Sequence, residues 1–220
     1  MINFLKQLLD YIYKEQCYLC RRTVEDVPLC SKCYKEILKN EANHAYTIEI
    51  IDGVPYYWAG FYSKNMQKLI RGLKYHGQKR LAPILAKFLY QYWKKFDASS
   101  ESFVIIPVPL YKKRQRKRKY NHMELVANEF AKLANCVVNT EIIARIKDTK
   151  PQYGLKQSER TRNMQGAFRV EIDFDKNQKL LIIDDILTTG STVKEMIKTL
   201  RAAGFLNITV LTITSHLSRK

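Results

Sequence analysis

Apolar residues recur along the first hundred positions at spacings typical of helices. In residues 3–15, 64–75 and 81–96 they fall three and four positions apart, as on a helix with one buried face. The aromatic segment VPYYWAGFY, residues 54–62, is instead typical of a strand. A polar linker, DASSES, follows at residues 97–102. This part of the chain is therefore predicted to be mainly helical.

From residue 103 onward the pattern becomes strand, loop and helix in repetition. The apolar runs FVIIPVP (103–109) and LLIIDD (180–185) are typical of strands buried on both faces. Helices are predicted at 121–134 and 192–203, and NITVLTIT (207–214) is a last strand. This alternation predicts an α/β fold with a mostly parallel sheet and helices on both faces. Ligands of such sheets bind at the carboxyl ends of the strands.

These patterns divide the chain into three expected parts. Residues 1–45 form an N-terminal helix and a small cysteine module. Residues 46–102 form a basic, helical hood region, and residues 103–220 form the α/β core.

Composition and charge narrow the class of protein. The 220 residues, 46% of them hydrophobic, suffice for one ordinary domain and a small module. The sequence contains no apolar run of about 18 residues and no signal-peptide pattern, so we expect a cytoplasmic protein without a transmembrane segment. The net charge is +17, and residues 64–122 hold most of it. A focused positive field favours phosphate-rich partners or an anionic membrane face; a solvated surface is the alternative.

Four of the five cysteines are grouped near the N-terminus. Cys17, Cys20, Cys30 and Cys33 form two C-x2-C pairs separated by nine residues, followed by a predicted helix at 31–39. Paired thiolates at this spacing can close on one tetrahedral ion, and disulfides are disfavoured in the cytoplasm. The pattern predicts a structural Zn²⁺ site, with four unrelated thiols as the alternative.

The segment LIIDDILTTGST, residues 181–192, delivers two carboxylates to the end of a buried strand. Asp184 and Asp185 precede small hydroxyl residues and a glycine, and Thr192 is expected to cap the helix that follows. The N–H groups and dipole of a helix N-terminus favour a phosphate. Carboxylates beside such a cradle suit a ligand with hydroxyls next to its phosphate, such as ribose 5-phosphate. The alternative is an acid pair that binds Mg²⁺ or caps a helix.

This segment resembles the 5-phosphoribosyl-1-pyrophosphate (PRPP) motif of type I phosphoribosyltransferases. The resemblance implies that Asp184 and Asp185 are the catalytic acids, which hold the ribose hydroxyls and position PRPP with Mg²⁺. It also implies a 5′-phosphate site made by Thr188, Thr189, Gly190, Ser191 and Thr192.

Two further loops support the same resemblance. Seven of the eight residues at 112–119 are basic, and this run resembles the family's pyrophosphate loop, with Lys112, Lys113 and Arg114 as the expected ligands. The alternative is a basic surface run, or one that contacts nucleic acid backbone. Residues 148–166 resemble the flexible loop that closes over the ligand, which implies phosphate contacts from Arg160 and Arg162.

Over nearly the whole chain the sequence resembles the ComF family of competence proteins. The segments are the cysteine module, LIRGLKYHGQKRLA, IPVPLYKKRQRKRKYNHMELVA, RIKDTKPQYGLKQSERTRNMQGAF and LLIIDDILTTGST, with Lys74, Arg114 and Arg160 at positions that the family keeps. The resemblance implies a cytoplasmic factor of natural transformation that handles incoming single-stranded DNA at the inner membrane, as a peripheral protein. It implies PRPP, single-stranded DNA and other competence proteins, such as a DNA helicase or a membrane channel, as partners.

One segment departs from that family's pattern. The family usually reads R-G-[FY]-N-Q after its basic loop, whereas this chain reads Arg118-Lys119-Tyr120-Asn121-His122. Lys119 therefore stands at the position of the glycine.

Three interpretations stay open at this point. The chain is a PRPP-binding competence factor that binds single-stranded DNA, an active phosphoribosyltransferase on an unidentified small acceptor, or a scaffold that works through its zinc module. No general base stands out, and we expect His76 and His122 to be polar surface residues. The candidate DNA contacts are Lys74, Lys79, Arg80, Arg116, Lys117, Arg118 and Lys119.

Overall fold

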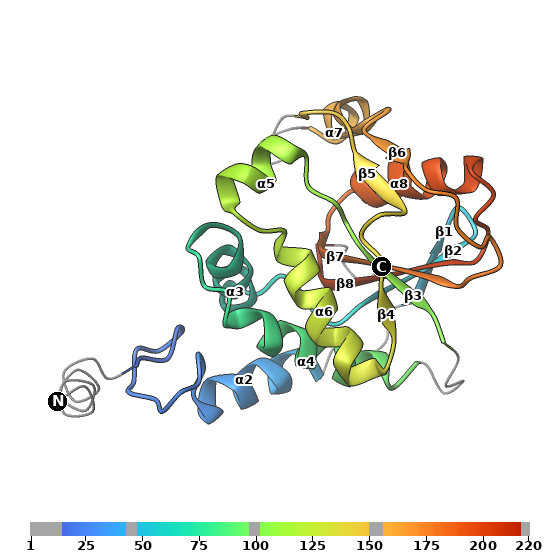
Figure 1. Ribbon diagram of the computed structural model, residues 1–220. Helices are drawn as coiled ribbons and strands as arrows, with labels where there is room; N and C mark the ends of the chain where they lie inside the picture. The colour runs from blue at the N-terminus through green and yellow to red at the C-terminus, as the bar shows by residue number, and fades with distance from the viewer. Residues whose placement is uncertain (1–14, 43–47, 97–101, 150–155, 217–220) are drawn as a thin grey trace, which may run out of the picture.

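A six-stranded, mostly parallel sheet forms the centre of the protein (Figure 1). The computed structural model describes residues 15–42, 48–96, 102–149 and 156–216, so that the helix predicted at 3–15 lies outside the described residues apart from its last position. The strand order is β1-β2-β8-β7-β3-β4, in which only the β1–β2 pair is antiparallel. The strands are β1 (Ile48–Ile51), β2 (Val54–Trp58), β3 (Val104–Pro107), β4 (Val137–Val138), β7 (Leu180–Leu187) and β8 (Ile208–Ser215).

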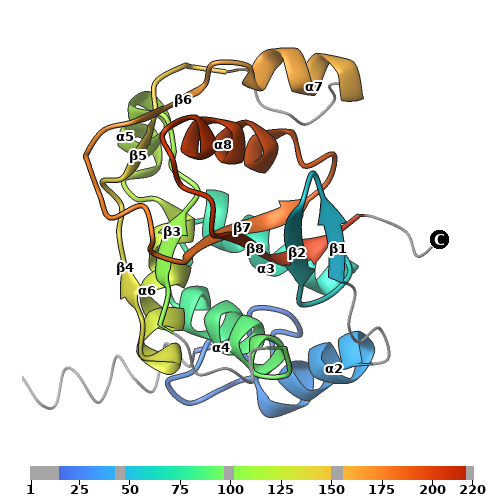
Figure 2. The same cartoon turned by 90° about the vertical axis from the view of Figure 1, so that its right-hand side faces the viewer.

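Helices cover both faces of this sheet, which confirms the fold class expected from the sequence (Figure 2). Along β7, Leu181 and Ile183 point into the core on one face, whereas Leu180 and Ile182 point into the core on the other face. Both faces of β7 are therefore buried, which explains its uninterrupted apolar run. On the first face lie α3 (Lys64–Tyr75), α4 (Leu81–Trp93) and α6 (His122–Ala134), and on the second lies α8 (Ser191–Ala202).

The cysteine module packs against α3. Helix α2 (Ser31–Ala42) follows the last cysteine pair, and the module shares the core of α3 and α4. Tyr18 lies so close to α3 that a Cβ at Gly72 would stand 2.6 Å from the Tyr18 hydroxyl. The same hydroxyl bonds to Nδ1 of His76 at 3.0 Å, and Lys68 donates to the carbonyl of Leu19 at 3.2 Å. The absence of a side chain at Gly72 thus allows the module to dock.

The segment between β4 and β7 differs from the sequence-based expectation. After α6 the chain forms β4, on the main sheet, and then β5 (Ile143–Arg145), which pairs with β6 (Phe168–Val170) in a separate two-stranded sheet. The polar stretch 148–166, predicted to be a loop, contains helix α7 (Gln157–Met164). Only Met164 of this helix is buried, so its sequence carries little apolar periodicity.

Two helix boundaries also required correction. The basic run predicted as a loop folds as α5 (Lys112–Arg118), a helix without buried residues. Helix α8 begins at Ser191 rather than Thr192, because Gly190 takes the N-cap position with a φ of 70° that other residues rarely adopt. Asn121 caps α6, and its side chain accepts a hydrogen bond of 3.0 Å from the N–H of Met123.

Lys119 ends α5 in the left-handed conformation, with a φ of 68°. A residue with a Cβ is strained there, by about 1 kcal/mol, whereas glycine is not. We therefore expect Lys119→Gly to raise the free energy of unfolding by about 0.5–1 kcal/mol in urea titrations. Lys117→Gly is the matched control, since it removes the same charge inside the helix and should lower stability by about as much. A loss of stability in Lys119→Gly like that in Lys117→Gly would contradict strain at Lys119.

Candidate functional site

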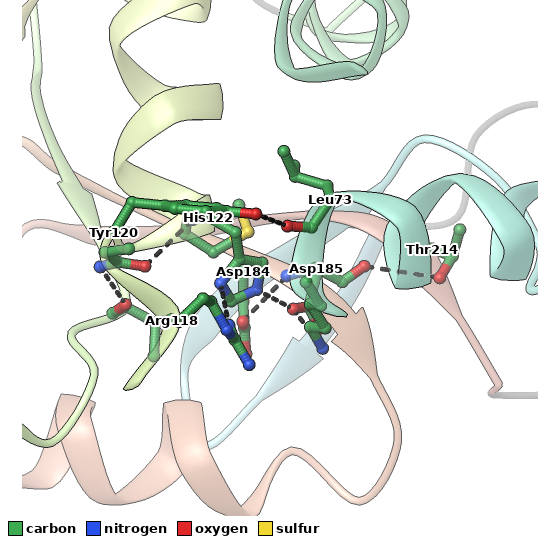
Figure 3. Close-up of polar contacts among 11 residues, drawn as sticks. Leu73, Arg118, Tyr120, His122, Asp184, Asp185 and Thr214 are labelled. Atoms are coloured by element: carbon green, nitrogen blue, oxygen red, sulfur yellow. Dashed lines mark hydrogen bonds and ion pairs between the residues drawn. The ribbon is translucent and has the colours of Figure 1, made fainter. Parts of the chain in front are cut away.

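Two carboxylates with different surroundings lie toward the end of β7 (Figure 3). Asp185 is buried, with 7% exposure. Its Oδ2 atom contacts side chains from two helices. Lys74, from α3, places its Nζ at 2.5 Å from Oδ2, and His122, from α6, places its Nε2 at 2.5 Å from the same oxygen. The backbone carbonyl of Asp185 accepts a bond of 3.4 Å from the hydroxyl of Thr214. Asp185 is thus fixed from three sides.

The contacts of His122 define its tautomer. Nη1 of Arg118 lies 2.7 Å from Nδ1, and a guanidinium can only donate, so Nδ1 is the acceptor and Nε2 carries the hydrogen donated to Asp185. Burial lowers the pKa of His122 to about 4, although Asp185 acts in the opposite direction. The imidazole is therefore neutral near neutral pH. The expectation of a surface residue was wrong: His122 is 4% exposed, because the start of α6 faces β7.

Lys74 also points inward, rather than toward solvent as a DNA contact would. Burial lowers the pKa of its ammonium, but the negative charges of Asp185 and Asp184 outweigh burial and raise that pKa overall. Lys74 therefore stays charged and compensates the charge of Asp185. A lysine on the basic helix 64–75 carries no sequence signal that separates it from its exposed neighbours.

The two carboxyl groups consequently differ in acidity. Burial raises the pKa of Asp185, but Lys74 and His122 overcome that effect and hold it far below its usual value. Among the described residues Asp184 forms no ion pair as close as these, so that burial first, and the charge of Asp185 second, raise its pKa to about 7. One adjacent acid is thus firmly ionised, and the other titrates near neutrality.

The residues predicted to cradle a phosphate do come together beside Asp184. A small pocket is lined by Asp184, Thr188, Gly190, Ser191 and Thr192, among others. Thr189 is not part of this lining, but its hydroxyl donates to that of Ser191 at 3.2 Å. The pocket lies at the N-terminus of the 12-residue helix α8, where N–H groups and the helix dipole favour an anion. Hydroxyls and a carboxylate beside such a terminus suit a phosphorylated sugar.

The residues predicted to bind pyrophosphate occupy the first turn of α5. Lys112 and Lys113 are exposed and Arg114 is half-buried. Lys113 forms an ion pair of 3.6 Å with Asp148, and Arg114 donates to the carbonyl of Thr149. The segment after β5 thus lies against the first turn of α5.

The two arginines of the predicted flexible loop lie on α7. Arg162 is exposed and Arg160 is half-buried. Burial and then the charge of Arg160 lower the pKa of His216, whose N–H bonds to the carbonyl of Leu187 at 2.9 Å. Helix α7 therefore lies within electrostatic reach of the end of β7.

One of the remaining basic candidates lies over an aromatic side chain that the sequence had not singled out. Tyr75 is 66% exposed, and the Arg118 guanidinium lies 5.3 Å from its ring centroid. Lys79 lies 5.0 Å from the ring of Tyr120, whereas Arg80 pairs with Glu15 and Asp26. Arg116, Lys117 and Lys119 are exposed on α5.

The four grouped cysteines fit a metal ion. Their Sγ atoms all lie within 4.8 Å of one another, with 3.7 Å between Cys20 and Cys30. Burial raises the pKa of Cys17, but backbone N–H groups of Cys20, Cys30 and Leu19 outweigh it and lower that pKa to about 6. A thiol that ionises readily is a good metal ligand. Together with Cys33, this cluster could hold an ion such as zinc.

Proteins of known name resemble this chain in sequence. No protein-family model matches it. Competence protein F of Haemophilus influenzae is 29% identical over 211 residues, which cover 88% of this chain and 87% of that protein. The DNA utilization protein YhgH of Salmonella typhimurium is 30% identical over 152 residues, which cover 68% of this chain and 66% of that protein.

Solved structures resemble the chain more distantly. Glutamine PRPP amidotransferase from B. subtilis gives a TM-score of 0.43 at 14% identity, over 64% of this chain and 30% of that chain. Orotate phosphoribosyltransferase from Aeropyrum pernix gives a TM-score of 0.41 at 15% identity, over 82% of this chain and 80% of that chain. None of the helices in the described residues has the length and apolar character needed to cross a membrane.

The raised pKa of Asp184 predicts a stability cost that depends on pH. A carboxyl whose pKa is higher in the folded than in the unfolded chain loses its stabilising contribution as the pH rises from about 4 to about 7. Asp184→Asn replaces the carboxyl with a neutral amide that does not titrate. The free energy of unfolding of the variant minus that of the wild type should therefore increase by about 2 kcal/mol from pH 5 to pH 8. Urea unfolding at both pH values measures this gain.

The opposite pH dependence of His122 cancels in that comparison, since both proteins contain it. Its lowered pKa makes stability fall as the pH drops from about 6.5 to about 4. Glu141→Gln, at an exposed position, is the control. A difference between Asp184→Asn and the wild type that does not change with pH would refute the raised pKa.

Proposed function

The chain belongs to the ComF family of competence proteins, and we propose that it is a PRPP-binding competence factor. In this proposal it handles incoming single-stranded DNA at the cytoplasmic face of the inner membrane, with Mg²⁺ bound alongside PRPP and Zn²⁺ held by the four cysteines. The observation that carries the proposal is the placement of Asp184 in one pocket with the N-terminus of α8.

The contacts assign different tasks to the two acids. Asp185 is already bound by Lys74 and His122, so it positions the end of β7. Asp184 is the carboxylate that lines the pocket, and it is the one that binds the ribose hydroxyls or Mg²⁺. The 5′-phosphate sits at the N-terminus of α8, and the pyrophosphate lies toward α5.

The DNA-binding part of the proposal rests on the exposed aromatic and basic side chains around α5. An exposed tyrosine offers a stacking platform for a base, and lysine and arginine bind the phosphate backbone. We define this basic aromatic face by its residues, which are Tyr75, Lys79, Arg116, Lys117, Arg118 and Lys119.

Calorimetry with PRPP in the presence of Mg²⁺ tests the ligand. Asp184→Asn should lower the affinity for PRPP at least tenfold, because it removes the charge that faces the pocket. Asp185→Asn is a poor test, since it leaves the buried Lys74 without its counter-charge and destabilises the fold. Asp173→Asn, an exposed acid ahead of β7, is the matched control. Equal affinity of wild type and Asp184→Asn would contradict the assignment.

Pyrophosphate release distinguishes the proposal from an active transferase with an unidentified small acceptor. PRPP is incubated with Mg²⁺ alone, with single-stranded DNA, or with candidate acceptors, and free pyrophosphate is measured. Release that depends on a small acceptor and not on DNA would favour the transferase, with DNA binding incidental.

Fluorescence anisotropy with a labelled oligothymidine over a series of salt concentrations tests the basic aromatic face. Lys117→Gln should reduce the slope of log affinity against log salt by about 0.7, as expected for one lost phosphate contact. Tyr75→Ala should leave the slope unchanged and weaken binding about 5- to 30-fold at every salt concentration, because it removes a stacking platform. Lys198→Gln, which removes an exposed lysine of α8 outside this face, is the control and should change neither quantity. Wild-type affinity that is independent of salt would exclude backbone contacts.

A further inference from the structure

Arg145 is a buried cation whose hydrogen-bonding capacity is largely unused. It ends β5 with 8% exposure. Both of its hydrogen bonds to described residues leave from Nη2, to the hydroxyl of Thr149 and to the sulfur of Met164. Among the same residues its buried Nε has no acceptor. A buried guanidinium with an unpaired N–H group costs free energy unless a ligand satisfies it.

A second guanidinium approaches Arg145 from α5. Arg114 donates to the backbone carbonyl of Thr149, while Arg145 donates to its hydroxyl, so that one residue holds both cations. Burial and then the charge of Arg114 lower the pKa of Arg145 to about 10. The two arginines therefore repel each other, although their hydrogen bonds to Thr149 hold them together.

The acidic groups nearby do not remove this excess of positive charge. Asp184 and Asp148 both attract Arg145. Asp148, however, also pairs with Lys113 at 3.6 Å, and Asp184 is the acid that is hardest to ionise at this site. Two guanidinium groups and one ammonium thus face two carboxylates, one of which is neutral for much of the time below pH 7.

We propose that Arg145 and Arg114 together bind the pyrophosphate group of the ligand, which makes Arg145 a further binding residue of this site. Two planar guanidinium groups, each with several N–H donors, match the several oxygens of a diphosphate better than ammonium groups do. With 8% exposure, Arg145 is too buried to lie along the backbone of a polymer. The inference rests on the proposed function, since the diphosphate is the pyrophosphate end of PRPP.

Calorimetry with inorganic pyrophosphate in Mg²⁺ buffer tests this inference on the full chain. Arg145→Gln should weaken pyrophosphate binding about 10- to 100-fold, and Arg145→Lys, which keeps the charge but loses the fork, should give an intermediate loss. The affinity for ribose 5-phosphate should not change in either variant. That split separates a lost diphosphate contact from general damage to the fold, which would weaken both ligands. The matched control is Arg169→Gln, which removes an exposed arginine from the neighbouring strand β6.

Two outcomes would overturn the inference: no pyrophosphate binding by the wild type, or wild-type affinity in both Arg145 variants. If Arg145→Gln does not fold, Arg145→Lys alone decides, and unchanged pyrophosphate affinity in that variant refutes the role. Failure of the proposed function looks different. In that case pyrophosphate binding still depends on Arg145, whereas PRPP affinity does not depend on Asp184.

Discussion

One buried carboxylate, Asp185, connects the elements that form the candidate site. Its Oδ2 atom receives Lys74 from α3 and His122 from α6, both at 2.5 Å, so that a single atom of β7 fixes two helices from distant parts of the sequence. Removing one partner of such a buried pair costs about 3–5 kcal/mol, since the other charge is left uncompensated. The position of Asp184, the preceding residue of β7, therefore depends on contacts made by its neighbour.

The same contacts explain why two adjacent aspartates behave differently. Lys74 and His122 stabilise the ionised form of Asp185, and its charge in turn opposes ionisation of Asp184. Environments that move the pKa values of paired carboxyl groups apart are typical of sites where the two groups have separate tasks. Here Asp185 orients the strand end, and Asp184 faces the pocket beside the N-terminus of α8.

The sequence predicted those parts of the site that depend on local pattern. The apolar run of a strand buried on both faces located β7 and, toward its end, Asp184. The spacing of the cysteines located the cluster of thiols. The sequence carries no comparable signal for how side chains of one element face another element. His122 begins a helix whose face toward β7 only tertiary packing determines, and Arg145 is a single arginine among strand-like residues. The left-handed turn at Lys119 contradicts local preference and could not be predicted from it.

Arg118 belongs to both surfaces that the structure presents. Its guanidinium lies over the exposed ring of Tyr75, and its Nη1 donates to the buried Nδ1 of His122. That second contact fixes the tautomer in which Nε2 donates to Asp185. Replacing Arg118 would therefore remove a cation from the basic aromatic face and release the histidine that holds the carboxylate. Lys117 and Tyr75 act on that face alone, so they separate DNA binding from the integrity of the PRPP pocket, whereas Arg118 cannot.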